Sequence, residues 1–151
     1  MKTRLSILLI AMTQDLVKPK LIIFDLDYTL ATPDGALYKN VKRMLEDIKN
    51  EGIKIALASY NKDGESILKK NKIRTYFDIV LCQSWWSVHD MDFKLGMLSS
   101  ILQTSTLQPF DVIFYDDHPK NIETASKLGI KAFLTKEDEI YDLYKHTRLA
   151  L

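Results

Sequence analysis

The chain has 151 residues, of which 46% are hydrophobic and 27% are charged, a composition typical of one soluble globular domain. This composition excludes a disordered chain, a collagen-like repeat and a multi-pass membrane protein. The 21 Lys and Arg residues nearly balance the 20 Asp and Glu residues, so the net charge does not indicate a broad nucleic-acid-binding surface. The single cysteine, Cys82, excludes an intramolecular disulfide and a cysteine-rich zinc site. We therefore expect a protein of the reducing cytoplasm that has no membrane partner.

The N-terminus begins with Lys2 and Arg4 ahead of an apolar stretch, 5–12, which resembles the start of a secretory signal. This stretch is much shorter than the ~20 apolar residues of a membrane-spanning helix, and no small-residue cleavage site follows it. We prefer a short element packed on the domain, or an extension ahead of a start at Met12, over an export signal. The sequence therefore predicts an N-terminal extension at 1–19 and one domain at 20–151.

Five short apolar runs predict the strands of a sheet. Runs without polar alternation are typical of parallel strands that are covered on both faces. The predicted strands span 21–24, 53–58, 79–82, 112–115 and 130–134.

The segments between these runs have helical periodicity. Val41, Met44, Leu45 and Ile48 recur at i, i+3, i+4 and i+7, which predicts an amphipathic helix. Similar patterns predict a short helix around 67–68 and longer helices around 95–102, 119–128 and 137–148. Regular alternation of strands and helices predicts a doubly wound, Rossmann-like α/β fold: a parallel sheet of about five strands with helices on both faces.

Polar residues follow several predicted strands at the point where each strand ends. Residues 25–29 follow the first strand, 59–61 follow the second, and 116–118 follow the fourth. Ligand sites in such sheets lie beyond the carboxyl ends of the strands. Four aspartates at one edge would repel one another, so we expect a bound cation, and oxygen ligands favour Mg²⁺. The alternative, that each aspartate only caps a loop or helix, is weaker for four together.

The six residues D-L-D-Y-T-L at 25–30 resemble the D-x-D-x-T signature of the haloacid dehalogenase superfamily of phosphotransferases. Ser59, Lys94 and the pair at 116–117 follow in the order of that superfamily's other motifs, and the resemblance covers about 20–135. More narrowly, D-L-D-Y-T-L and the stretch Y-D-D-H-P-K-N-I-E-T-A-S-K-L-G-I resemble the magnesium-dependent phosphatase family. The chain departs from that family at two positions, with Ala31 where tryptophan is usual and Tyr60 where arginine is common. The second departure leaves the substrate open.

The resemblance implies a magnesium-dependent phosphatase that hydrolyses a phosphate monoester. Asp25 would attack phosphorus and form an aspartyl-phosphate. Asp27 would protonate the leaving oxygen and then activate the water that breaks the intermediate. The Asp25 carboxylate, the Asp27 backbone carbonyl and the pair Asp116 and Asp117 would hold Mg²⁺.

The resemblance also implies the substrate contacts. Ser59 and nearby backbone N–H groups would bind phosphate oxygens, and Lys94 would pair with both the phosphate and Asp25. A lysine in the first turn of a helix opposes the helix dipole, which suggests a function for Lys94. The alternative is a solvated lysine, as for Lys120 at a similar position, and the order of the motifs favours the functional interpretation. The remaining predicted substrate contacts are Leu26, Asp27, Tyr60, Trp85 and Trp86.

Trp85 and Trp86 have two interpretations. They form either an aromatic platform for the substrate or a cover of core residues over the end of the sheet. His89 lies in the same predicted loop, and His118 lies in the loop before Pro119. With no cysteine partners, neither histidine is expected to be a metal ligand.

The spacing of the motifs leaves no room for a cap domain. From Thr29 to Ser59 there are 30 positions and from Ser59 to Lys94 there are 35, and predicted strands and helices already fill both gaps. An independent domain needs ~50 residues or more. We therefore expect an open site, suited to phosphotyrosine, phosphosugars or a phosphate carried on a protein.

Two other functions remain open on the sequence. A phospho-acceptor domain of the receiver kind also gathers acidic residues, a hydroxyl and a lysine at one sheet edge. Its acidic pair, however, follows the first strand rather than a late one. A phosphatase of nucleic-acid 3′ ends is the second alternative, and the near-neutral charge counts against it.

Overall fold

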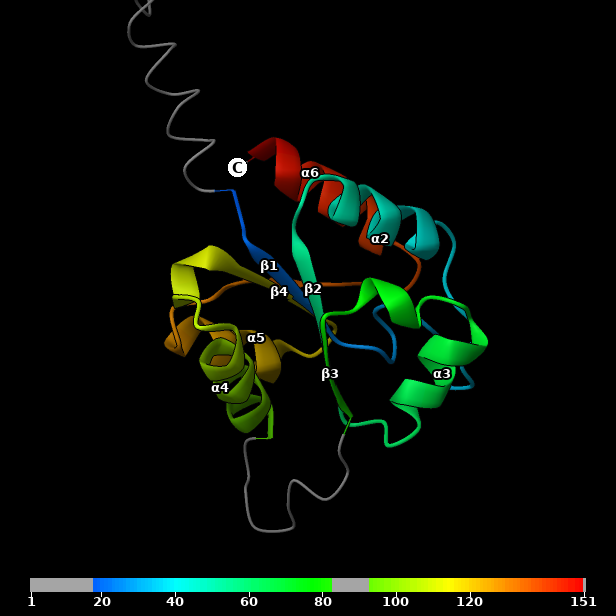
Figure 1. Ribbon diagram of the computed structural model, residues 1–151, viewed down its shortest axis with the longest axis horizontal. Coiled ribbons are helices and arrows are strands. Elements are labelled where there is room, and N and C mark those ends of the chain that lie inside the picture. The colour runs from blue at the N-terminus through cyan, green and yellow to red at the C-terminus, as the bar shows by residue number, and fades with distance from the viewer. Residues whose placement is uncertain (1–17, 83–92, 151) are drawn as a thin grey trace, which may run out of the picture.

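The computed structural model describes residues 18–82 and 93–150 and shows one parallel sheet of five strands (Figure 1). The strand order is β3-β2-β1-β4-β5. The strands are β1 (Leu21–Phe24), β2 (Lys54–Ser59), β3 (Ile79–Cys82), β4 (Val112–Asp116) and β5 (Lys131–Leu134). All five predicted strands are confirmed, with ends that shift by one residue at most. The predicted extension at 1–19 lies outside the described residues except for its last two positions.

Helices connect the strands in strict alternation. They are α2 (Val41–Asn50), α3 (Gly64–Lys70), α4 (Phe93–Ser105), α5 (Pro119–Lys127) and α6 (Ile140–Ala150), with 3₁₀ turns η1 (Arg74–Tyr76) and η2 (Pro109–Asp111). The Rossmann-like α/β fold predicted from the sequence is confirmed. Within the described ranges, none of the helices combines the length and the apolar character that crossing a bilayer requires.

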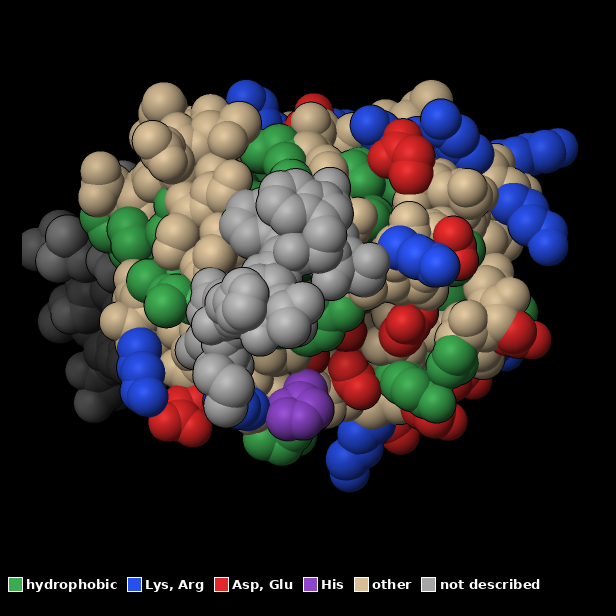
Figure 2. Space-filling view, turned by 90° about the horizontal axis from the view of Figure 1, so that it is seen from below, with side chains coloured by type: hydrophobic (Ala, Val, Ile, Leu, Met, Phe, Trp, Pro, Cys, Tyr) green, Lys and Arg blue, Asp and Glu red, His purple; other side chains and the backbone are tan. Residues whose placement is uncertain are grey.

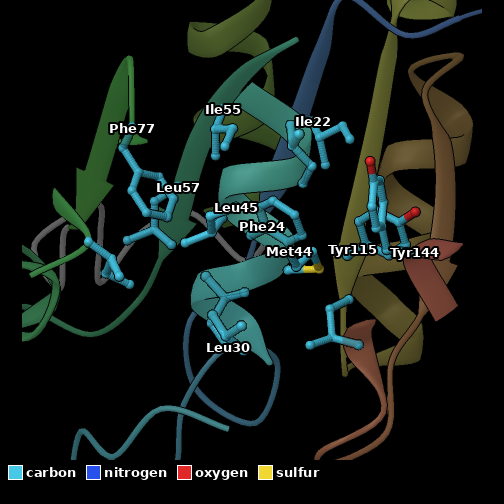
Figure 3. Packing of buried hydrophobic residues seen from close by; sticks show 14 of the residues in the cluster. Ile22, Phe24, Leu30, Met44, Leu45, Ile55, Leu57, Phe77, Tyr115 and Tyr144 are labelled. Carbon is cyan, nitrogen blue, oxygen red and sulfur yellow. The ribbon is translucent and has the colours of Figure 1, made fainter. Parts of the chain in front are cut away.

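The two faces of the sheet build two separate hydrophobic cores, because successive side chains of a strand point to opposite faces. Ile22 and Phe24 face one core, which α2, α3 and α6 cover, while Leu21 and Ile23 face the other, which α4 and α5 cover. In the first core the ring centroids of Phe24 and Tyr115 lie 5.5 Å apart in a nearly parallel stack (Figure 3). Helices therefore cover both faces of the sheet.

The edge strands differ from the sequence-based expectation that every strand would be fully covered. β1 and β4 are buried along their whole length, as is β2 apart from its first residue. All four residues of β3 are half-buried, and Lys131 and Leu134 of β5 are exposed. The reason is topological, since β3 and β5 each have a neighbouring strand on one side only.

The direction in which strands are added to the sheet reverses at β1. The chain passes from β1 to β2 and β3 on one side and then crosses to β4 on the other side of β1. Phe24 is level with Leu57 on one side and with Tyr115 on the other, and the Asp25 N–H donates to the Tyr115 carbonyl at 3.0 Å. Asp25 therefore emerges beside Asp116 at the switch point, where doubly wound folds bind ligands.

Candidate active site

Three carboxylates lie together at the carboxyl edge of the sheet. One oxygen of each of Asp25, Asp116 and Asp117 lies within 4.8 Å of the other two. Asp25 follows β1 directly and Asp116 ends β4, so their proximity is a consequence of the strand pairing. Figure 2 looks onto this face of the molecule, where acidic side chains gather. Among the described residues, no other group of three or more acidic, histidine or cysteine side chains has this geometry.

The cluster fits a metal site. Burial raises the pKa of Asp25 to about 8, the neighbouring Asp116 and Asp117 add to the rise, and Lys94 opposes it. Burial likewise raises the pKa of Asp116. A bound cation would favour the ionised forms that these buried groups otherwise resist. The donors are oxygens only, which suits a hard divalent ion.

Lys94 extends from the first turn of α4 into the acidic cluster. Its Nζ donates to Asp25 Oδ1 at 3.0 Å and to the Ala58 carbonyl, and it lies 3.3 Å from Asp116 Oδ2. The Lys94 side chain is fully buried, whereas Lys120, at the equivalent position of α5, is exposed. The interpretation of Lys94 as a solvated lysine is therefore wrong. One ammonium cannot balance three carboxylates, and the remaining negative charge supports a cation at the site.

A tight turn after β1 presents Asp27. The Leu26 carbonyl accepts hydrogen bonds from the N–H groups of Thr29, Leu30 and Ala31 at 2.9–3.1 Å. Tyr28 has a φ of 61°, a left-handed conformation that is uncommon for a residue with a side chain. The Leu26 side chain is buried in the core, and the substrate contact predicted for this residue stays a prediction. The turn directs Asp27 and Tyr28 toward the edge of the sheet.

Thr29 connects this turn to the end of β5. Its hydroxyl lies 3.1 Å from the hydroxyl of Thr135, which directly follows β5, and both residues are buried. The threonine of the D-x-D-x-T pattern therefore joins the turn after β1 to the segment that follows the edge strand β5. It does not line the pocket described below.

Asp116 is held in place by the start of α5. Its Oδ1 accepts the His118 N–H at 2.8 Å, and its Oδ2 accepts from Asn121 Nδ2 at 3.1 Å. His118 Nδ1 accepts the Lys120 N–H at 3.2 Å, so this imidazole caps the helix, as expected of a loop residue before Pro119.

A pocket of about 160 Å³ opens over the acidic cluster. Two aromatic side chains, Tyr28 (43% exposed) and Tyr60 (39% exposed), stand at its rim, and Lys94 Nζ lies 4.8 Å from the centre of the Tyr60 ring. The lining residues are Asp25, Asp27, Tyr28, Ser59, Tyr60, Asp117, His118 and Asn121.

The structure therefore places most of the predicted site residues in one small volume. The exceptions are Leu26, whose side chain is buried in the core, and Trp85 and Trp86, which lie outside the described residues, as does His89. Two asparagines that the sequence analysis did not assign to the site, Asn61 and Asn121, bind Asp27 and Asp116 respectively. Each asparagine lies a few positions after a predicted site residue at the end of a strand, and this position was the available signal in the sequence. The sequence does not indicate which carboxylate each asparagine would bind.

Comparison with known proteins assigns the family. The family model for haloacid dehalogenase-like hydrolases matches residues 32–135, and no curated protein matched the chain significantly. A hydrolase from Streptococcus pneumoniae TIGR4 superimposes with a TM-score of 0.72 at 17% identity, over 86% of this chain and 98% of that chain.

Other similar structures include β-phosphoglucomutase from Clostridium difficile, with a TM-score of 0.68 at 11% identity over 87% of this chain and 97% of that chain. CbbY from Rhodobacter sphaeroides in complex with phosphate has a TM-score of 0.67 at 12% identity, over 78% of this chain and 86% of that chain. At these identities the structures share the fold alone. Since the family model matches well over half of the sequence, the chain belongs to the haloacid dehalogenase-like hydrolases.

Proposed function

We propose that the protein is a magnesium-dependent phosphatase that hydrolyses a phosphate monoester through an aspartyl-phosphate on Asp25. The observation that carries this proposal is the buried contact of 3.0 Å between Lys94 Nζ and Asp25 Oδ1, inside a three-carboxylate cluster and beneath a small pocket. A buried carboxylate with an ammonium beside it suits attack on a phosphoryl group, because the ammonium attracts the anionic substrate to the nucleophile.

The carboxylates of Asp25, Asp116 and Asp117, with the backbone carbonyl of Asp27, would hold the metal. When bound, Mg²⁺ supplies positive charge that favours ionised Asp25 and offsets the negative charge of the transferring phosphoryl group. Lys94 Nζ lies between Asp25 and Asp116 and keeps these two carboxylates oriented.

The proposed first step forms a bond between an Asp25 carboxylate oxygen and phosphorus. The bond from phosphorus to the leaving oxygen breaks, and the Asp27 carboxyl donates its proton to that oxygen. In the second step Asp27, now a carboxylate, accepts a proton from the water that attacks phosphorus. The acyl phosphate breaks, Asp25 is regenerated and inorganic phosphate leaves.

Ser59 and Lys94 would hold the phosphate during both steps. Ser59 Oγ accepts the Asn61 N–H at 3.0 Å, which leaves the hydroxyl proton for a phosphate oxygen. The Lys94 ammonium is a charged donor, and charged donors bind phosphate about twice as strongly as neutral ones.

The size of the pocket limits what it encloses. About 160 Å³ is well below the ~300–1,000 Å³ of ordinary small-molecule pockets. We propose that the pocket encloses the phosphoryl group and that the rest of the substrate lies outside it, against Tyr28 and Tyr60. This arrangement suits phosphotyrosine, a phosphosugar or a phosphoprotein in the cytoplasm, and it gives no specific support to nucleic-acid ends. Because β-phosphoglucomutase shares the fold, we propose sugar phosphates as the first substrates to assay.

The test is steady-state turnover by the purified chain. We expect it to release phosphate repeatedly from 4-nitrophenyl phosphate with Mg²⁺, and to stop when EDTA is added in excess. A panel of phosphotyrosine peptide, sugar phosphates and 3′-phosphorylated oligonucleotide then ranks substrates by kcat/KM. Full activity in EDTA would overturn the metal assignment. A single stoichiometric phosphorylation without turnover would indicate a phospho-acceptor domain instead.

A further inference from the structure

Asn61 contacts two of the proposed catalytic and substrate-binding residues at once. It is half-buried in the loop between β2 and α3 and does not line the pocket. Its side-chain Nδ2 donates to Asp27 Oδ1 at 3.1 Å, and its backbone N–H donates to Ser59 Oγ at 3.0 Å. Asp27 and Asn61 are 34 positions apart, so this one residue connects the loop after β2 to the turn after β1.

The orientation of the Asn61 amide is fixed by a third contact. Its Oδ1 accepts the Asp63 N–H at 2.9 Å, and its backbone carbonyl accepts the Gly64 N–H at 3.0 Å. This is a local turn in which the asparagine side chain mimics the backbone. A flipped amide would set NH₂ against the Asp63 N–H and oxygen against the Asp27 carboxylate. The loop therefore presents the NH₂ group, and not the oxygen, to Asp27.

The contact has a direct consequence for Asp27. With Oδ1 held by Asn61, the carboxyl group cannot rotate freely, and this contact leaves Oδ2 as the oxygen for proton transfer. A displacement of ~1 Å in a reacting group can cost on the order of 100-fold in rate. The contact to Ser59 also has an orienting effect. The Asn61 N–H occupies a lone pair of Ser59 Oγ, and the hydroxyl proton is then directed toward the phosphate.

We propose that Asn61 is a positioning residue, which fixes the proton-transferring oxygen of Asp27 and the donor direction of Ser59. This inference rests on the proposed phosphatase function. It assigns Asn61 no contact with the substrate. The effect of losing Asn61 therefore depends on how much the leaving group needs a proton.

Three substitutions separate positioning from folding. Asn61→Asp keeps an oxygen for the Asp63 N–H but replaces the donor with a second carboxylate beside Asp27. Asn61→Ser keeps a shorter acceptor that cannot reach Asp27, and Asn61→Ala removes both groups. The matched control is Asn71→Ala. Asn71 directly follows α3, and its Nδ2 donates to the carbonyls of Gly35 and Ile67 and to no predicted site residue.

The readout is kcat/KM for two esters whose leaving groups differ in acidity. 4-Nitrophenolate leaves with little need of a proton, whereas the alkoxide of an alkyl phosphate needs one. We expect the Asn61 variants to lose at least about tenfold more activity on the alkyl ester, since general acid catalysis contributes ~100–10,000-fold. Asn71→Ala should change both esters by the same factor. In an Asp27→Asn background, Asn61→Ala should not change the ratio further, because coupled residues are not additive.

Three results would overturn the inference. The first is an unchanged ester ratio in folded Asn61 variants, and the second is a full additional loss in the Asp27→Asn background. The third is loss of folding in all three Asn61 variants, measured by circular dichroism, which would give Asn61 a purely structural role. If the wild-type protein turned over neither ester with Mg²⁺, the proposed function would fail and this inference with it. Wild-type turnover with unchanged ratios would remove the inference alone.

Discussion

Lys94 Nζ and Asp25 Oδ1 lie 3.0 Å apart at the carboxyl edge of the sheet, although 69 positions separate the two residues in the chain. Both are buried, so each charge depends on the other. Removing one member of a buried ion pair leaves an uncompensated charge, which is more damaging than the loss of an exposed pair. This relationship makes Lys94 the most informative residue for testing the site.

We expect Lys94→Met to lower kcat/KM by at least about 100-fold, because removing one charge-stabilising donor typically costs ~100–1,000-fold. The control is Lys120→Met, since Lys120 is also the second residue of its helix but is exposed. Steady-state kinetics on 4-nitrophenyl phosphate measure both variants. A Lys94→Met enzyme within tenfold of wild type would argue against a role for this ammonium in phosphate binding.

Substitutions of Asp25 and Asp27, the two aspartates of the first motif, should impair different steps of the reaction. Asp25→Asn should abolish turnover, since an amide is a poor nucleophile. Asp27→Asn should allow slow formation of the aspartyl-phosphate but impair its hydrolysis. Rapid-quench detection of acid-stable phosphoprotein distinguishes the two, and Asp142→Asn, an exposed position on α6, serves as the control. Near wild-type steady-state rates in either variant would contradict the assigned roles.

Magnesium should stabilise the folded protein independently of activity. A ligand at 100 times its Kd adds ~2.7 kcal/mol to the free energy of unfolding, or about 5–10 °C in Tm for a domain of this size. We expect this increase in wild-type protein and its reversal by EDTA, as measured by thermal unfolding. Asp117→Asn should lose most of the increase while Asp142→Asn keeps it. An equal increase in both variants would place the ion elsewhere.

A pH-dependent contact joins α2 to α6 on the far side of the molecule from the site. Burial raises the pKa of Glu51, but hydrogen bonds from Arg148 and Tyr144 outweigh it and hold the pKa below its usual value of 4.5. A carboxyl with a lowered pKa stabilises the fold above its unfolded pKa, and this stabilisation disappears as the pH falls through the folded pKa.

Glu51→Gln should therefore destabilise the protein at pH 7, by about 1 kcal/mol or less for a partly exposed ion pair. The difference from wild type should shrink as the pH falls below 4.5 and through the lowered pKa of Glu51, because the carboxyl then becomes protonated in the folded protein as well. Urea unfolding at pH 7 and pH 3.5 measures both values. A difference that stayed constant between the two pH values would show that the charge of Glu51 does not stabilise the contact.

Trp85 and Trp86 provide a test of substrate binding outside the pocket. If they form an aromatic platform, Trp85→Ala and Trp86→Ala should lower kcat/KM for a phosphotyrosine peptide more than for a sugar phosphate, because aromatic rings pack on aromatic rings with additional energy of ~0.5–1.5 kcal/mol. Equal kcat/KM values for wild type and variants on every substrate would favour the alternative that both residues belong to the core.

The sequence by itself determined the alternation of strands and helices and the edge at which the polar residues gather. Hydrophobic periodicity is a local property, and the carboxyl ends of parallel strands must lie at one edge. The proximity of Asp25 to Asp116 follows from that rule once β1 and β4 are neighbours. The order of the motifs indicated a phosphatase, and the roles of the individual residues stay predictions until the variants are measured.

Only the tertiary structure decided which side chains meet. Lys94 could have been a solvated lysine, but packing of α4 against the sheet buries it beside Asp25 and Asp116. The bond from Asn61 to Asp27 depends on the turn after β1 and the loop after β2 together, and neither segment specifies the other. Likewise, the incomplete burial of β3 and β5 follows from their position at the edges of the sheet. Strand order depends on how the helices cross over and not on the composition of any one strand.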